Sequence, residues 1–174
     1  MLTPAPSAVA ALRAATGPDH DIVDAAYGAF DLTDRASYAA FLQAHARALP
    51  AAERTLTAIP GLPAFPLRTP LLTADLAALG TTMPPPLPFA LPDGEAAGWG
   101  ALYVMEGSRL GGIMLARSVP ADMPAAYLGA RHGSGAWRNL LAAIDAAATS
   151  DAWIDAAITG ARATFDLYRR APAP

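Results

Sequence analysis

The sequence predicts a compact all-α protein, a single-domain bundle of seven to eight helices over residues 1–174. Hydrophobic residues make up 53% of the chain, which is enough for one substantial core. Alanine dominates and β-branched residues are sparse, and this composition favours helices because alanine has the highest helix propensity. Apolar residues recur at helical spacing, and no segment has the pattern of a credible strand.

Caps and breakers delimit the helices of the first half of the chain. Serine, threonine and aspartate cap the free N–H groups at a helix start, whereas glycine and proline mark helix ends. These signals predict a first helix over about 7–16, and from Thr16 onward either a second helix or a kinked continuation of the first. Further helices are predicted over about 33–49, 51–60 and 69–80. Residues 60–70 form a proline-rich connection.

The second half begins with another proline-rich segment, residues 81–92. A long helix is expected from Asp93 to about Arg117, followed by a short helical piece near Ala125. Two further helices are expected over about 135–148 and 151–169, and Ser150 caps the last one.

Charge and cysteine content exclude several classes of function. The formal net charge is −3 and all twelve basic residues are arginines, with no basic stripe that would bind nucleic acid or an anionic membrane. The absence of cysteine excludes disulfides, thiolate nucleophiles and iron–sulfur clusters. Met1–Ser7 lacks the features of a secretory signal, and no run of about 18 uncharged apolar residues predicts a membrane span. A cytoplasmic protein is therefore expected.

The segment Glu106-Gly-Ser-Arg-Leu-Gly-Gly112 is unusual for a helix, because each glycine there costs roughly 1 kcal/mol relative to alanine. Gly107 and Gly111 are four residues apart and share one face, where they leave a strip of bare backbone. Either a tightly packed helix or a flat ligand such as a porphyrin can lie against this strip, and the pattern alone leaves both open. The glycines also permit a kink when a ligand enters.

Three histidines are candidates for a metal ligand, since neutral imidazole commonly binds metals. His20 is the strongest candidate, although a lone helical histidine is more often packed or hydrogen-bonded. His45 lies on the apolar face of its helix and is expected in the core, and His132 is expected in a solvated loop. The chain lacks the Glu-x-x-His motif of di-iron bundles, the glycine motifs that bind nucleotide phosphates, and the nucleophile elbow of hydrolases.

Two motifs together resemble those of bacterial haem oxygenases. Leu12-Arg-Ala-Ala-Thr-Gly-Pro-Asp-His20-Asp-Ile-Val-Asp24 is similar to their proximal helix, and Glu106–Gly112 is similar to their distal helix in its Glu-Gly-Ser-x-Leu-Gly form. The motifs stand in the family's order at a compatible separation, and Trp137-Arg and Ala163-Thr-Phe165 also fit its later helices. The resemblance covers nearly the whole chain and implies the haem oxygenase-like fold.

The resemblance implies that haem is both cofactor and substrate, and it assigns residues to both of its faces. His20 would bind the iron, and Asp24 would orient its imidazole directly or through water. The glycine strip would cover the other face and tilt bound oxygen toward one meso carbon. Ser108 stands where animal enzymes have an acidic residue, which leaves the proton route to ordered water. The implied catalytic residues are His20, Gly107, Ser108 and Gly111, and the implied haem-binding residues are Arg13, Thr16, Asp24, Tyr103, Gly107, Gly111, Gly112, Phe165 and Tyr168.

Ordinary structural roles stay open for several of these residues. Asp24 and Arg13 are equally compatible with solvated helix positions, and Phe165 is equally compatible with a core position. The residues alone therefore leave the edges of any pocket undecided.

The implied activity is the oxidative cleavage of haem to biliverdin, carbon monoxide and ferrous iron, with oxygen and electrons from a separate reductase of ferredoxin or flavoprotein type. Its purpose would be iron acquisition or supply of biliverdin to a bacteriophytochrome. The alternative is a non-catalytic protein of the same fold that binds haem, a bilin or a partner. Thiaminase-type enzymes share this fold, but their nucleophile is a cysteine, which the chain lacks.

Overall fold

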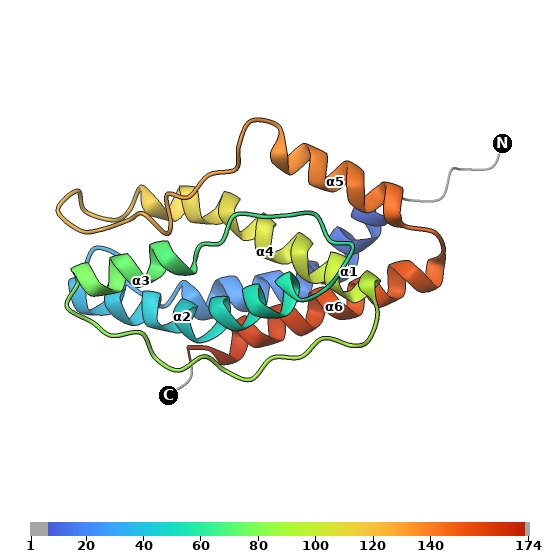
Figure 1. The fold of residues 1–174 in the computed structure, drawn as a ribbon. Coiled ribbons are helices and arrows are strands. Elements are labelled where there is room, and N and C mark those ends of the chain that lie inside the picture. The colour runs from blue at the N-terminus through green and yellow to red at the C-terminus, as the bar shows by residue number, and fades with distance from the viewer. Residues whose placement is uncertain (1–6, 173–174) are drawn as a thin grey trace.

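The computed structural model describes residues 7–172, and within this range the protein has six α-helices and no strand (Figure 1). The helices are α1 (Ala8–Tyr27), α2 (Arg35–Thr57), α3 (Thr69–Ala78), α4 (Glu95–Ala116), α5 (Ala136–Ala147) and α6 (Asp151–Arg170). The first six residues, where the sequence predicts no secretory signal, lie outside the described residues. No helix within 7–172 is long and apolar enough to cross a membrane.

The all-α class is confirmed, but the prediction of seven to eight helices is wrong, because two predicted breaks are absent from the described chain. Pro18 lies inside α1 and Pro50 lies inside α2, although an interior proline costs about 3 kcal/mol or more in a helix. α2 is buried both before and after Pro50, so packing of the flanking turns outweighs the lost backbone hydrogen bond there. In α1, Thr16 is buried before Pro18 but residues 17–26 are not, so burial of the next turns does not explain why this helix continues.

The short helical piece expected near Ala125 forms turns instead. The Asp75 carboxylate of α3 accepts hydrogen bonds from the backbone N–H groups of Ala126 at 3.2 Å and Tyr127 at 2.8 Å. These two N–H groups are satisfied by a side chain from another element, so the segment has less need of helical hydrogen bonds.

The predicted caps of three helices are confirmed. The side chains of Ser7, Asp34 and Ser150 each accept a hydrogen bond from a backbone N–H group in the first turn of α1, α2 and α6. Pro70 lies in the first turn of α3, and Gly80 follows that helix with a φ of +73°. Local sequence signals therefore fix most helix starts, and the errors lie in the helix interiors.

Helices α4 and α6 cross at very close range through two glycines. A Cβ atom on Gly100 would lie 1.7 Å from the carbonyl oxygen of Ala157, and one on Gly160 would lie 2.0 Å from that of Ala97. Neither position can hold a side chain, so the two backbones pack directly against each other. Because α1 also packs on α6, α6 supports both α1 and α4, while α5 lies on the other side of α4 (Figure 1).

The apolar core has two parts. The larger cluster centres on α2 and includes Tyr38, Phe41 and Leu49, and the smaller one joins α1, α4, α5 and α6. The proline-rich residues 81–92 run along the larger cluster as an extended strap, where the N–H of Leu87 donates to the carbonyl of Arg47 at 2.7 Å. These contacts set the positions of the three helices that surround the candidate site.

Candidate active site

A cavity of about 540 Å³ lies between α1 and α4. Its volume falls within the range of roughly 300–1000 Å³ that is usual for small-molecule sites. All the site residues expected from the sequence line this one cavity, and they come from α1, α4 and α6. Their individual roles stay predictions. The residues are Arg13, Thr16, His20, Asp24, Tyr103, Gly107, Ser108, Gly111, Gly112, Phe165 and Tyr168.

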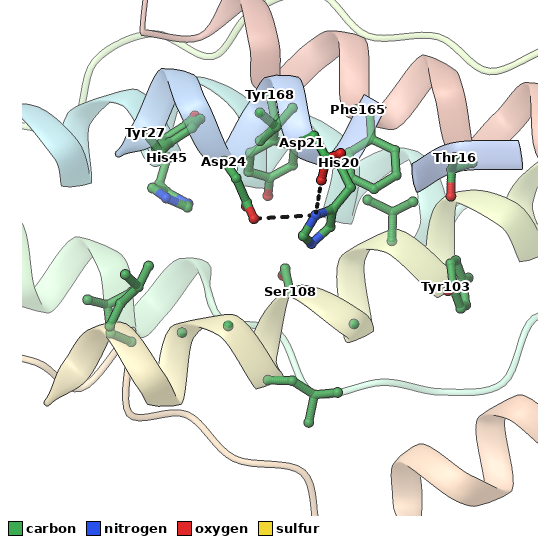
Figure 2. Close-up of a pocket in the computed structure, with 18 of the residues that line it drawn as sticks. Thr16, His20, Asp21, Asp24, Tyr27, His45, Tyr103, Ser108, Phe165 and Tyr168 are labelled. Carbon is green, nitrogen blue, oxygen red and sulfur yellow. Dashed lines mark ion pairs between the residues drawn. The ribbon is translucent and has the colours of Figure 1, made fainter. Parts of the chain in front are cut away.

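His20 projects from α1 toward α4, and Ser108 points back from α4 across the cavity (Figure 2). The His20 Nδ1 atom lies 3.3 Å from Asp24 Oδ2, one helical turn further on, and 3.9 Å from Asp21 Oδ1. The Phe165 ring stands edge-on to the imidazole at 6.0 Å between centroids. With Nδ1 beside the carboxylates, Nε2 is the nitrogen available to a ligand. A histidine held in this way is typical of metal binding.

The His20 site cannot form a metal centre from protein ligands alone. Within residues 7–172 there is no group of three or more histidine, cysteine, aspartate or glutamate side chains placed to hold an ion. A metal bound at His20 therefore needs its other ligands from a bound molecule. A porphyrin supplies four nitrogens in one plane, and the cavity has room for a flat group beside the imidazole.

The three glycines of the distal segment have different surroundings. A Cβ atom on Gly111 would meet nothing within 4 Å, so this position faces open space. A Cβ on Gly107 would lie 3.3 Å from the Trp137 ring, and one on Gly112 would lie 3.0 Å from the carbonyl oxygen of Leu128. Gly107 and Gly112 therefore permit close packing, whereas Gly111 leaves space beside the cavity, where a flat ligand stays a prediction.

Arg68 is a cavity residue that the sequence analysis missed. Its guanidinium Nη2 donates to Ser108 Oγ at 2.9 Å and to the Met105 carbonyl at 2.8 Å. The backbone N–H of Arg68 donates to Glu53 Oε1 at 2.7 Å. The residue is only 3% exposed. No local signal in the proline-rich connection identifies it, because its partners on α4 lie 37 and 40 residues away.

His45 and Tyr127 also line the cavity, and their side chains share a hydrogen bond. His45 Nδ1 lies 2.7 Å from the Tyr127 hydroxyl oxygen. Burial, together with the charge of Arg68, lowers the pKa of His45 to about 3. Burial raises the pKa of Tyr127. Both side chains are therefore neutral at pH 7, and one proton lies in the hydrogen bond between His45 Nδ1 and the Tyr127 oxygen. His45 is packed among aromatic rings and hydrogen-bonded, as expected, but it is half-buried at the cavity wall and not in the core, and its partner was not predicted.

Two further polar groups lie at this end of the cavity. The Tyr27 hydroxyl is buried without a hydrogen-bond partner in the described part of the chain, and burial raises its pKa. Burial also raises the pKa of Tyr168, whose hydroxyl contacts the Met105 sulfur at 3.5 Å. A buried hydroxyl without a protein partner is a typical binding point for an ordered water or a ligand atom.

The expectation of a solvated His132 is wrong. Its side chain is only 10% exposed, and its Nε2 lies 3.2 Å from Glu106 Oε2. Its ring stacks on Trp137 at 5.6 Å between centroids. The loop sequence around His132 is rich in glycine and serine, which is why it resembles a solvated segment, but α4 and α5 enclose the histidine.

Known proteins similar to this chain include haem oxygenases of two bacteria, while no family model matches the chain. Over 147 residues the chain is 33% identical to a haem oxygenase of Xanthomonas campestris pv. campestris, covering 76% of this chain and 86% of that protein. Its fold is similar to that of the haem oxygenase of Neisseria meningitidis, solved in NO- and CO-bound forms. That match has a TM-score of 0.79 and 26% identity over 97% of this chain and 91% of the other. The sequence motifs, the helical fold and these matches agree, and the chain belongs to the bacterial haem oxygenase family.

Proposed function

We propose that this protein binds haem in the cavity between α1 and α4 and cleaves it to biliverdin, carbon monoxide and ferrous iron, with oxygen and electrons from a separate reductase. The observation that carries the proposal is the pairing of opposite walls in one cavity: His20 on α1, and the open backbone at Gly111 on α4. Haem supplies the iron that activates oxygen and is itself the substrate.

On the α1 wall, His20 holds the haem and Asp24 holds His20. The Asp24 side chain is 68% exposed, so water screens its charge at the imidazole. The histidine therefore acts as a neutral ligand whose ring is oriented but only weakly polarised. Arg13 also lines the cavity and gives a cation for the haem carboxylates.

On the α4 wall, the backbone at Gly111 sets how close the ring can approach. Without a side chain at this position, the helix can lie near the haem and would limit the space left over that face of the ring. The selectivity for one meso carbon then comes from steric contact and haem seating. Ser108 contributes its hydroxyl group to the same wall, and Arg68 holds that hydroxyl in place by a hydrogen bond.

Proton delivery is assigned to water held by the neutral polar groups of the cavity. His45, Tyr127 and Tyr27 all line it, and the Tyr27 hydroxyl has no protein partner within residues 7–172. Water that bonds to such groups can pass a proton without any of them carrying a charge. We therefore place the proton route at this end of the cavity and not at Ser108.

Haemin titration of the purified protein tests the proposal. We expect a Soret band in the wild type, its loss in His20→Ala, and its return when imidazole is added to that variant. Ascorbate with catalase in air should then convert the bound haem to biliverdin. Stable binding without bilin formation would favour the alternative, a non-catalytic haem- or bilin-binding protein. Absence of binding would refute both.

The surroundings of the reaction follow from its chemistry. The electron donor that we propose is a ferredoxin or a flavoprotein reductase, and the place of action is the cytoplasm. The proposed acceptor of the product is a bacteriophytochrome, which can be checked by co-expression with an apo-phytochrome and detection of its covalently bound bilin. Iron acquisition instead predicts free bilin release and growth on haem as the iron source.

A further inference from the structure

The two charged residues of the glycine segment point away from the cavity. Glu106 and Arg109 are 5% and 3% exposed, and neither lines the cavity. Arg109 Nε donates to both Glu106 carboxylate oxygens, at 3.0 and 2.9 Å. The Arg109 Nη2 group donates to the carbonyl of Pro66, in the connection before α3. The ion pair therefore ties the back of α4 to a segment some forty residues earlier in the chain.

The same carboxylate also faces the loop before α5. His132 Nε2 lies 3.2 Å from Glu106 Oε2, and the His132 ring stacks on Trp137. Trp137 in turn stacks on Tyr103 at 5.8 Å and occupies the space beside the missing Cβ of Gly107. Trp137 and Tyr103 both line the cavity. A chain of contacts thus runs from the buried ion pair to the cavity wall.

Close contacts at Gly107 and Gly112 hold parts of the glycine segment, but the apolar side chains in and just after it are poorly packed. Leu110 is 45% exposed and Met114 is 59% exposed. Gly111 touches nothing through its Cβ direction, and glycine gives the backbone more freedom than any other residue. Directional charge-assisted hydrogen bonds fix a helix rotation that loose apolar contacts cannot. The only buried charged residues in this part of α4 are Glu106 and Arg109, as far as the described residues extend.

We propose that Glu106 and Arg109 are positioning residues, which fix the rotation of the Gly107–Gly112 backbone and thereby the meso carbon that is attacked. The second half of this statement rests on the proposed function, whereas the first half concerns the protein without haem. The two halves can therefore be tested apart.

Hydrogen–deuterium exchange of the haem-free protein tests the anchor. In Glu106→Gln, which keeps the side-chain size, we expect amides 107–112 to exchange at least tenfold faster than in the wild type, with peptides of α6 unchanged. Arg109→Lys keeps the charge but cannot reach Glu106 and Pro66 together, so a smaller increase is expected. Arg117→Gln removes an exposed arginine at the end of the same helix and should leave exchange unchanged.

The biliverdin isomer ratio, measured by chromatography after turnover with ascorbate, tests the consequence. We expect one dominant isomer in the wild type and in Arg117→Gln, and at least a threefold larger minor fraction in Glu106→Gln. A merely structural role would lower the yield without changing this ratio. If Glu106→Gln fails to fold, the neutral double variant Glu106→Gln/Arg109→Met takes its place, because it leaves no unpaired buried charge.

Three results are decisive. Wild-type exchange at 107–112 in the variants would overturn the anchor, and faster exchange with an unchanged isomer ratio would overturn its effect on selectivity. If the wild type forms no biliverdin, the proposed function fails, and exchange in the haem-free protein still decides whether Glu106 and Arg109 hold the segment.

Discussion

Replacing Gly100 with alanine should destabilise the protein, although alanine is the better helix former. The added Cβ would lie 1.7 Å from the Ala157 carbonyl oxygen, and backbone atoms cannot move aside as a side chain does. Ordinary contact begins at 3.4 Å, so α4 and α6 must separate by about 1.7 Å at their crossing. The whole interface between the two helices opens with them.

The size of the effect follows from two opposing contributions. Overpacking of a core costs about 1–3 kcal/mol, and this contact lies at the upper end because only backbone can yield. The higher helix propensity of alanine stabilises α4 by roughly 1 kcal/mol relative to glycine. The free energy of unfolding should therefore fall by about 2 kcal/mol. For a domain of this length, that corresponds to a loss of about 4–8 °C in Tm.

Gly111→Ala is the matched control, since it makes the same substitution in the same helix. Its Cβ would meet nothing within 4 Å, so this variant should gain up to roughly 1 kcal/mol. Urea and thermal unfolding of the haem-free variants, followed by far-ultraviolet circular dichroism, measures both changes. If Gly100→Ala is as stable as the wild type, the close crossing does not constrain the fold.

Three further predictions concern the cavity. The pKa of His45 is about 3 in the folded protein against 6.5 unfolded, so between these values only the unfolded state binds the proton and stability falls as pH falls. From pH 7 to pH 5 the free energy of unfolding should fall by about 2 kcal/mol. Urea unfolding of His45→Gln should not show this fall, and an equal fall in the variant would exclude His45 as its cause. Gly111→Leu should leave the haem-free protein folded but weaken haemin binding at least tenfold, and unchanged affinity would place the haem elsewhere. Tyr127→Phe leaves His45 Nδ1 without its partner, so chemical denaturation should show a loss of about 1–3 kcal/mol, whereas wild-type stability would mean that water replaces the bond.

Most helix starts could be predicted from the sequence because the information is local. Ser7, Asp34 and Ser150 each cap a helix only a few residues away. The break predicted near Pro50 fails for the opposite reason. The turns on both sides of Pro50 are buried against segments distant in the sequence, and no local pattern indicates that packing. The continuation of α1 through Pro18 has no such explanation in burial.

The candidate site divides in the same way. His20 and the distal glycines stand in motifs, so their expected positions on one cavity could be stated before the structure. Arg68 and Tyr127 lie in connections without helical pattern, and their bonds reach Ser108 and His45 over 40 and 82 residues. Only the tertiary fold brings such pairs together, so no spacing in the sequence indicates them.

The small residues of α4 explain why the cavity lies where it does. Gly100 brings one side of the helix onto α6, and Gly107 and Gly112 bring other sides against Trp137 and the loop at Leu128. Each of these contacts holds the helix through the absence of a side chain. Gly111 is the one distal glycine whose Cβ direction meets no atom of residues 7–172. The helix therefore packs closely on several sides, and at Gly111 it exposes its backbone to the cavity between α1 and α4. This bare side lines the cavity opposite His20, where the proposed haem would lie.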